Sequence, residues 1–331
     1  MAYTIAFFGT KPYDESSFTD KNKEFGFEIR YYKGHLNKNN VLLTQGVDAV
    51  CIFVNDIADA EVLRIMASNG VKLLALRCAG FNNVDLNAAA AAGITVVRVP
   101  AYSPYAVAEY TVALMLSLNR KIPRASWRTK DGNFSLHGLM GFDMHGKTAG
   151  IIGTGKIAKI LIHILKGFGM NILAYDLYPD YNFAREEKIV YTSLDELYHS
   201  SDIISLHCPL TTKYLINDYS ISKMKDGVMI INTGRGQLIH TNALIEGLKN
   251  KKIGSAGLDV YEEESEYFYE DQSDRIIDDD VLARLLSFNN VIVTSHQAFF
   301  THEALENIAM TTLQNIRDFI NHKPLLNEVK K

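Results

Sequence analysis

The sequence predicts an α/β protein built from doubly wound parallel sheets with helices on both faces. Short apolar runs suited to buried strands alternate with segments of helical periodicity along nearly the whole chain. One of these strands leads into a glycine turn, and a helix and a further strand follow that turn. With 331 residues, the chain is long enough for two domains that each have a full core.

The first hundred residues show this alternation clearly. A helical pattern at 58–68 lies between the strands, which are expected at 5–8, 49–54, 72–76 and 94–99. Gly80 forms a turn just after the third of these strands, a usual place for ligand contact, although an ordinary strand-to-helix turn would explain it equally well. Pro100 and Pro104 enclose a stiff segment, so we expect a domain boundary ahead of a long helix at 105–118.

The most informative motif is a strand, glycine turn, helix and strand, expected at 149–152, 153–155, 156–168 and 170–176. Gly153 lets the chain turn sharply, and Gly155 has no side chain that would block a pyrophosphate at the helix N-terminus. Asp176 ends the second strand, where a carboxylate can accept both ribose hydroxyls of an adenosine. Ala158 replaces the third glycine of the usual pattern, and a methyl group is tolerated there. The motif predicts a dinucleotide without a 2′-phosphate.

A competing motif lies just before this one. Residues 141–148 match the phosphate loop of nucleotide triphosphatases, which requires a strand before it and a helix after it. The preceding segment 134–140 is interrupted by a histidine and a glycine, and a strand follows the motif. A near-match that starts at Gly150 has Ile157 where a magnesium-binding hydroxyl is needed. We interpret both matches as coincidental.

The alternation resumes after Asp176. Strands are expected at 202–206, 228–231, 253–259 and 291–294, and helices at 194–198, 242–248, 281–286 and 305–320. The acidic segment 261–280 is expected to be an irregular loop. These elements supply βαβ units on both sides of the glycine turn.

Composition excludes several classes of partner. The net charge of −4, with 47% hydrophobic and 22% charged residues, predicts neither a nucleic-acid partner nor an anionic membrane surface. The N-terminus lacks a basic leader and its apolar run is short, so we expect a first strand there and not a signal peptide. The apolar segment 102–118 contains Glu109, so we expect a core helix and not a membrane span.

Cysteine usage bears on compartment and metal binding. Cys51, Cys78 and Cys208 are scattered and odd in number, which provides no disulfide framework and is typical of a cytoplasmic protein. His207-Cys208 lacks companions at metal-ligand spacing, so no metal site is predicted.

Three residues are candidates for chemistry with a dinucleotide. Hydride transfer to a ketone needs a proton donor and a cation for any neighbouring carboxylate. Arg235 follows a buried strand, but it could also be an arginine capping a surface turn. His296 directly follows another strand, where a lone histidine is more often a core residue. Glu264 lies within an acidic run that would ordinarily be solvated.

Several motifs together resemble the D-isomer-specific 2-hydroxyacid dehydrogenases, and most closely the members that interconvert pyruvate and D-lactate. They are Arg77 to Gly80 with Asn83 and Asp85, Val99 to Pro104 with Ala106 to Glu109, Gly153 to Gly155, His207 to Leu210, Thr233 to Gly236, Asp259 to Glu262, and Ser295 to Phe299. The resemblance covers nearly the whole chain in order. It departs from the family at Ala158, at Gly234 where serine is common, at Tyr110 where histidine often stands, and in a short loop after Pro209.

The resemblance implies an architecture of two Rossmann-like domains. Residues 1–101 and 299–331 would form a substrate domain that is discontinuous in sequence, and residues 102–298 an NAD-binding domain. Substrate contacts are expected from the backbone N–H groups of Ala79 and Gly80, from Tyr102, and from Phe299. Cofactor contacts are expected from Gly153, Thr154, Gly155, Lys156, Ile157, Asp176, Cys208, Pro209, Thr212, Thr233, Gly234, Arg235 and Asp259.

The implied reaction is the reversible reduction of pyruvate by NADH. Arg235 would clamp the substrate carboxylate, and His296, held by Glu264, would act as the acid and base. Two alternatives remain open: a larger 2-keto acid as substrate, and a non-catalytic NAD-sensing protein that keeps the fold as a binding module. We also expect a homo-oligomer, either a dimer or a tetramer.

Overall fold

The chain divides into two compact units. The computed structural model describes residues 3–211, 213–264 and 267–330. The first unit comprises residues 1–103 and 300–331, and the second comprises residues 104–299. The division lies two residues beyond the boundary expected near Pro100, and Phe299 belongs to the second unit instead of the first.

The first unit is built on a five-stranded parallel sheet in the order β2-β1-β3-β4-β5. Its strands are β1 (Thr4–Phe7), β2 (Glu28–Tyr31), β3 (Ala49–Ile52), β4 (Leu73–Leu76) and β5 (Thr95–Arg98). Every residue of β1, β3 and β4 is buried, which is why these strands are almost entirely apolar. The strand order reverses between β1 and β3, and such switch points form crevices at the carboxyl ends of the strands.

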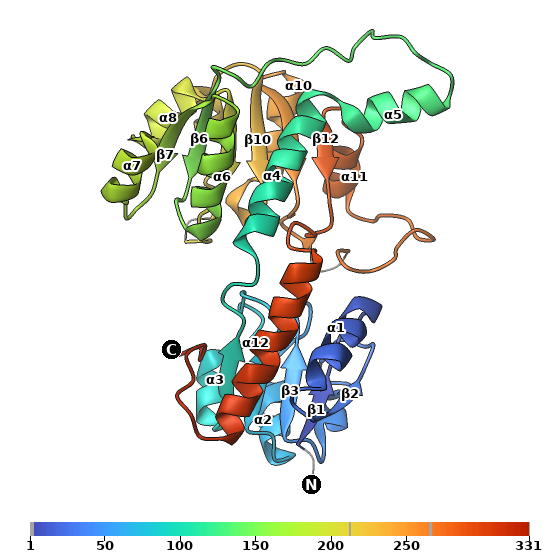
Figure 1. The fold of residues 1–331 in the computed structure, drawn as a ribbon. Helices are drawn as coiled ribbons and strands as arrows, with labels where there is room; N and C mark the ends of the chain where they lie inside the picture. Colours follow the sequence, from blue (N-terminus) through green and yellow to red (C-terminus); the bar gives the residue numbers. More distant parts are fainter. Residues whose placement is uncertain (1–2, 212, 265–266, 331) are drawn as a thin grey trace. The chain divides into compact units, whose positions relative to one another are not determined.

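Helices from both ends of the chain complete this unit. They are α1 (Pro12–Asn22), α2 (Ala60–Ser68), α3 (Leu86–Ala91) and α12 (His302–Ile320), with a short 3₁₀ helix η1 (Val41–Thr44). The C-terminal helix α12 packs against α1, β4 and β5 (Figure 1). Beyond it the chain returns to the sheet, where Val329 donates a backbone hydrogen bond to Val96. The unit is therefore discontinuous in sequence.

The second unit has a seven-stranded parallel sheet in the order β12-β11-β10-β9-β6-β7-β8. Its strands are β6 (Thr148–Ile152), β7 (Asn171–Tyr175), β8 (Val190–Tyr191), β9 (Ile203–Leu206), β10 (Val228–Asn232), β11 (Ile253–Leu258) and β12 (Val291–Val293). The order reverses between β6 and β9, so the expected ligand crevice opens at the carboxyl ends of these two strands. Thr148 begins a strand, which confirms that the preceding phosphate-loop pattern lacks its helix.

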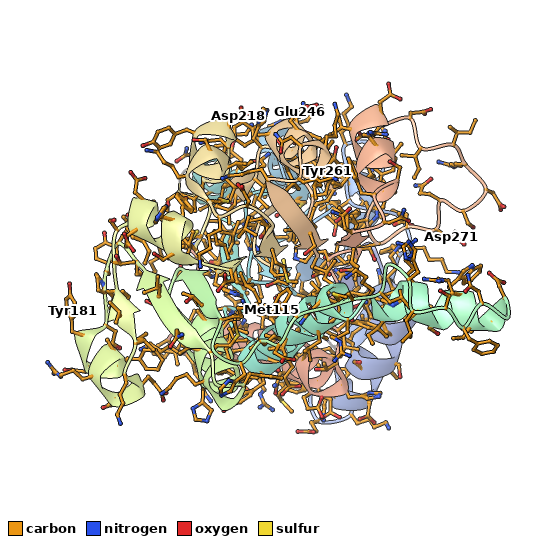
Figure 2. The ribbon with its side chains drawn as sticks, turned by 90° about the horizontal axis from the view of Figure 1, so that it is seen from above. Met115, Tyr181, Asp218, Glu246, Tyr261 and Asp271 are labelled. Carbon is orange, nitrogen blue, oxygen red and sulfur yellow. The ribbon has the colours of Figure 1, made fainter. Side chains whose placement is uncertain are left out.

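Two helical layers cover this sheet. The helices are α4 (Pro104–Asn119), α5 (Ile122–Lys130), α6 (Lys156–Gly167), α7 (Tyr181–Glu187), α8 (Leu194–Ser200), α9 (Asp218–Lys223), α10 (Thr241–Lys249) and α11 (Asp280–Leu286), with the 3₁₀ helix η2 (Gly236–Leu238). The side-by-side pair α4 and α6 forms one layer, and α8 to α11 form the other (Figure 1). Met115 of α4 lies inside the unit, fully buried (Figure 2).

An arm extends from the second unit. It consists of α5 and the irregular segment 131–143, and it projects on the same side as the acidic segment near Asp271, opposite Tyr181 (Figure 2). Lys121 begins the arm with a left-handed backbone at φ 52°. No residue of α5 is buried, and the helices expected from the sequence do not include it.

Candidate active site

The glycine turn has the geometry that a dinucleotide site needs. Gly153 has φ +89°, and a Cβ atom there would lie 2.5 Å from the backbone nitrogen of Cys208. Gly155 is the N-cap of the 12-residue helix α6, and no described atom lies within 4 Å of its would-be Cβ. The helix N-terminus therefore opens onto a space that can receive an anion.

Asp176 lies at the end of β7, beside the turn. Its Oδ2 accepts hydrogen bonds from the backbone N–H and the hydroxyl of Thr154, at 2.6 and 2.9 Å, and its Oδ1 accepts the N–H of Tyr178 at 2.9 Å. Burial raises the pKa of Asp176, but these hydrogen bonds outweigh burial and hold the pKa below its usual range. The carboxylate is therefore charged, at the end of the strand next to the glycine turn.

The other cofactor candidates gather at the carboxyl ends of the same sheet. Lys156 and Ile157 form the first turn of α6, and the remaining candidates follow β9, β10 and β11: Cys208, Pro209, Thr233, Gly234, Arg235 and Asp259. Thr212 lies outside the described residues. Thr233 is buried and shares a 3.0 Å hydrogen bond with Thr111 of α4.

His207, at the end of β9, is fixed as a neutral residue. Burial lowers the pKa of His207 to about 4, and its Nε2 lies 2.8 Å from the hydroxyl of Ser205. The ring is therefore uncharged at neutral pH and serves as a hydrogen-bonding element of the strand end. It cannot supply the cation that an anionic substrate would need.

Glu264 and His296 form the pair that the acidic segment concealed. Oε1 of Glu264 lies 2.9 Å from Nδ1 of His296, while its Oε2 accepts the backbone N–H of Tyr261 at 3.1 Å. Both side chains are largely buried, at 23% and 19% exposure. Glu262 is also engaged, because it accepts the N–H of Thr241 at 2.7 Å. The expectation that most of this acidic run is solvated therefore does not extend to Glu262 and Glu264.

The turn that carries His296 is organised by Asp259. This buried carboxylate accepts the hydroxyl of Thr294 at 2.6 Å and the backbone N–H groups of Gln297 and Ala298 at 2.9 and 2.8 Å. Burial raises the pKa of Asp259 in spite of these hydrogen bonds. Its oxygens thus bind both flanks of His296, a supporting role that sequence reasoning missed. The available signals were a buried strand that ends in aspartate and the family motif that begins at Asp259.

Arg235 projects from the end of β10, next to the strand that leads to Glu264. Its Nη1 donates to the carbonyl of Gly234 at 2.7 Å, and no described carboxylate is paired with its guanidinium. A Cβ at Gly236 would lie 2.0 Å from the carbonyl oxygen of Tyr261, so the two strand ends are in close contact. A cation without an acidic partner, beside an acid–histidine pair, is suited to an anionic ligand.

The candidates in the first unit follow two neighbouring strands: Ala79 and Gly80 come after β4, and Tyr102 comes after β5. The carbonyl of Ala79 accepts Nη1 of Arg98 at 2.8 Å, and the carbonyl of Gly80 accepts the Cys78 thiol at 3.3 Å. Within the described residues, the N–H groups of Ala79 and Gly80 have no hydrogen-bond acceptor. The backbone of Tyr102 is fixed by Asn307, whose amide donates to its carbonyl at 2.7 Å. Phe299 is buried in the second unit.

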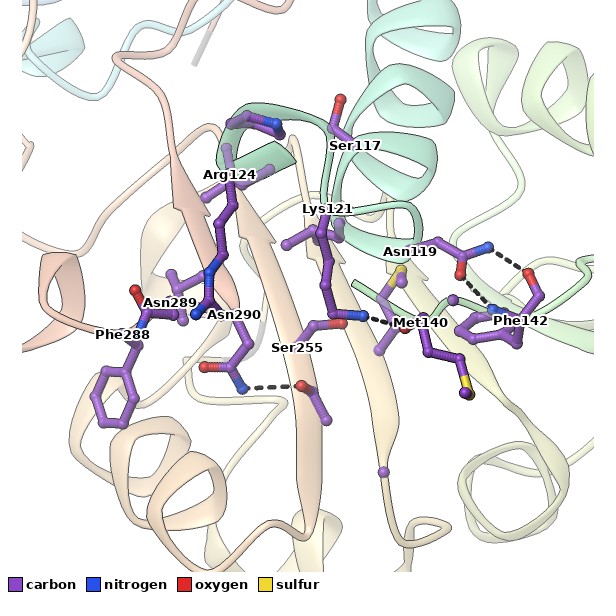
Figure 3. A pocket seen from close by; sticks show the side chains of 18 residues that line it. Ser117, Asn119, Lys121, Arg124, Met140, Phe142, Ser255, Phe288, Asn289 and Asn290 are labelled. Carbon is purple, nitrogen blue, oxygen red and sulfur yellow. Dashed lines mark hydrogen bonds between the residues drawn. The ribbon is translucent and has the colours of Figure 1, made fainter. Parts of the chain in front are cut away.

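A second hollow of the second unit lies at the opposite ends of the strands. This cavity of about 560 Å³ lies between the start of the arm and the amino ends of β10, β11 and β12. In Figure 3, Lys121 reaches the carbonyl of Met140, and the amide of Asn119 holds the backbone of Phe142 at 2.7 and 2.8 Å. The hollow contains none of the catalytic candidates, so it is distinct from the candidate site.

Two further properties of the described residues concern membrane-spanning helices and groups of metal ligands. None of its helices combines the length and apolar character needed to cross a membrane. No three histidine, cysteine or acidic side chains among the described residues are grouped so that they could hold a metal ion.

The chain is similar to known proteins over almost its full length. A family model described as D-isomer specific 2-hydroxyacid dehydrogenase, NAD binding domain, matches residues 112–298. D-lactate dehydrogenase of Escherichia coli is 51% identical over 98% of this chain and 99% of its own length, and its apo structure superimposes with a TM-score of 0.91 over 99% of this chain and all of that one.

Two other relatives agree with this match. A 2-hydroxyacid dehydrogenase homolog of Haemophilus influenzae is 54% identical over 94% of this chain and 95% of its own. The solved structure of the pyruvate reductase of Chlamydomonas reinhardtii has 44% sequence identity to this chain and a TM-score of 0.94 over 98% of each chain. The chain therefore belongs to the D-isomer specific 2-hydroxyacid dehydrogenases and is an NAD-dependent oxidoreductase of that family.

Proposed function

We propose that the protein is an NAD-dependent D-lactate dehydrogenase that reversibly reduces pyruvate. The observation that carries the proposal is the 2.9 Å contact between Glu264 and His296, next to the strand end that bears Arg235. The names of the E. coli and Chlamydomonas relatives support pyruvate as the substrate. In this proposal the first unit is the substrate domain and the second unit is the NAD-binding domain.

The chain's own groups would carry the proton and the substrate charge. Arg235 binds the carboxylate of pyruvate through its planar donors, and the N–H groups of Ala79 and Gly80 are further donors to that carboxylate. NADH, when bound, supplies the hydride from its nicotinamide ring. Because Nδ1 of His296 is engaged by Glu264, Nε2 is the ring nitrogen that delivers the proton to the carbonyl oxygen as the alcohol forms. In the reverse reaction the neutral ring takes that proton back.

The direct test is an assay of NADH oxidation with pyruvate and a panel of larger 2-keto acids. We expect pyruvate to have the highest kcat/KM and D-lactate to be the product. A larger acid with a higher kcat/KM would identify the alternative substrate, whose pocket Tyr102 and Phe299 would shape. NADH binding without turnover of any 2-keto acid would support a non-catalytic NAD-sensing protein instead.

Coenzyme selectivity tests the role of Asp176. Its charge favours the free ribose diol and repels a 2′-phosphate, so we expect kcat/KM for NADH to exceed that for NADPH by about 10²-fold or more. Asp176→Ser should reduce this ratio mainly by weakening NADH binding and relieving the repulsion. Comparable rates with NADH and NADPH in the unchanged protein would contradict the assignment.

Replacing Glu264 by glutamine tests the pair with a nearly isosteric change. The amide can still contact the ring, but it no longer offsets the positive charge of the proton donor. We expect kcat for pyruvate reduction to fall about 10- to 10²-fold, the range of a hydrogen bond to a charged group. Glu263→Gln, in the same acidic run, is the matched control and should retain normal kcat. Equal rates in the two variants would mean that another group orients His296.

Further parts of the proposal concern assembly and compartment. We propose a homo-oligomer, a dimer or a tetramer, in which the arm forms part of the contact between copies. This is supported by the exposed apolar side chains of the arm: Trp127 at 69%, Phe134 at 76%, Leu136 at 82% and Met140 at 88%. We also propose a cytoplasmic location, supported by the three free thiols of the chain.

A further inference from the structure

The turn 294–298, which carries His296, has a strained backbone. His296 has φ +53°, a left-handed conformation that is uncommon for a residue with a side chain. Its N–H donates to the carbonyls of Asp259 and Thr294, at 2.7 and 3.1 Å. A backbone in this region persists only where surrounding contacts determine it. The direction in which the imidazole points therefore depends on the groups that hold this turn.

Two of these groups are tyrosine hydroxyls from elements far apart in the sequence. Tyr269, in the acidic segment, donates to the carbonyl of His296 at 3.2 Å, and its ring centroid lies 5.9 Å from that of the imidazole. Tyr110, in α4, accepts the side-chain amide N–H of Gln297 at 2.8 Å. The two hydroxyls thus contact the turn at His296 and at the residue that follows it.

Tyr110 occupies a position where this sequence departs from its family. Tyr110 follows the Ala108-Glu109 pair, where the resembling proteins often carry histidine. The next residue of α4, Thr111, bonds Thr233 at 3.0 Å, so this part of α4 supports both the turn and the strand end next to Arg235. Asp259 fixes the turn by accepting the backbone N–H groups of Gln297 and Ala298. Glu264 fixes only the rotation of the imidazole ring, through Nδ1.

We propose that Tyr110 and Tyr269 are positioning residues for the proton transfer by His296. The proposal rests on the proposed function, because it concerns how the catalytic imidazole is aimed. Tyr269 holds the His296 carbonyl, and Tyr110 holds the side chain of Gln297, the next residue. Loss of either hydroxyl lets the turn sample other backbone conformations, in which Nε2 is displaced from the substrate oxygen. Such a displacement of Nε2 lowers the rate of the chemical step without altering the binding of NADH at the glycine turn.

The experiment uses the full-length protein and removes one oxygen atom at a time. The variants are Tyr269→Phe, Tyr110→Phe and the double variant, with Tyr110→His as the conservative replacement, because a ring nitrogen can still accept the Gln297 amide. Tyr198→Phe is the matched control: it also removes a hydroxyl that donates to a carbonyl in the same unit, that of Leu215 at 3.4 Å, away from the turn. For each variant, kcat with pyruvate, KM for NADH, the solvent deuterium isotope effect on kcat, and Tm are measured.

We expect each phenylalanine variant at the turn to lose about fivefold in kcat, which is the effect of one ordinary hydrogen bond. KM for NADH should stay within twofold, and the solvent isotope effect should rise because proton transfer limits the rate more strongly. Tyr110→His should retain most of the activity. Tyr198→Phe should change Tm alone.

The outcomes separate this inference from the function on which it rests. An unchanged protein that reduces no 2-keto acid would overturn the proposed function itself. If that protein is active and His296→Ala is inactive, while both tyrosine variants behave like Tyr198→Phe, the function stands and the positioning role is overturned. A loss of kcat that only parallels the fall in Tm, with an unchanged isotope effect, would also overturn it, because it would show a merely structural role.

Discussion

The His296→Ala protein should lose about 10³-fold or more of kcat for pyruvate reduction at every pH, because the imidazole is the proton donor of the pair that it forms with Glu264. NADH binding should be nearly unchanged, since the glycine turn and Asp176 lie at β6 and β7, away from the strand end that carries His296. Titration of NADH fluorescence and steady-state kinetics measure the two properties separately.

The backbone at this position determines the choice of controls. Asparagine tolerates φ +53° better than most residues, so His296→Asn removes the acid while keeping the turn. His322→Ala is the matched control, because His322 is also a histidine with a left-handed backbone, at φ 52°. It should retain full activity. Substantial activity in both His296 variants would assign the proton transfer to a different group.

The buried framework of the protein could be predicted because its signals are local. Strands such as β1, β3, β4, β9 and β10 are short, mostly apolar and wholly buried, and the structure places each of them within a parallel sheet. The turn at Gly153 could also be predicted, because a sharp turn next to a strand leaves no room for a Cβ. The predicted fold class is therefore confirmed.

The acid–histidine pair could not be derived from the residues alone. Glu264 and His296 are 32 residues apart, and the contact forms because β11 and β12 are neighbours in a sheet whose order no local pattern encodes. Within a run of acidic residues, a buried carboxylate looks the same as a solvated one. Similarly, the return of α12 to the first unit depends on packing against α1 and β4.

Arg77 is buried, although arginine side chains are usually exposed to solvent. It is 1% exposed at the end of β4, its guanidinium lies 4.4 Å from the ring centroid of Phe7, and Nη2 donates to the carbonyl of Gly9 at 2.9 Å. Nε lies 3.5 Å from a carboxylate oxygen of Asp14, which is also buried. Burial raises the pKa of Asp14, partly offset by the arginine. Sequence periodicity places neither charge inside, because both are almost always solvated in other proteins.

Arg235→Lys should lower kcat/KM for pyruvate by about 10²-fold, which corresponds to ~2.7 kcal/mol of lost transition-state binding. Lysine keeps the positive charge but replaces a planar set of donors with a single ammonium, so it cannot hold a carboxylate in a fixed plane. KM for pyruvate should therefore rise, and kcat should fall because the carbonyl is less well aimed at His296. The Kd of NADH should change little.

The local environment of Arg235 makes this prediction specific. Its backbone is anchored independently of the side chain, since the carbonyl accepts the amide of Asn232 at 2.9 Å and the N–H of Leu238 at 3.1 Å. The substitution should therefore leave the strand end intact. Arg284→Lys, whose guanidinium lies over the Phe288 ring at 5.0 Å, is the control for loss of a guanidinium elsewhere in the unit. Pyruvate kinetics that are equal in the two variants would mean that Arg235 only caps its turn through Gly234, and that the substrate carboxylate binds elsewhere.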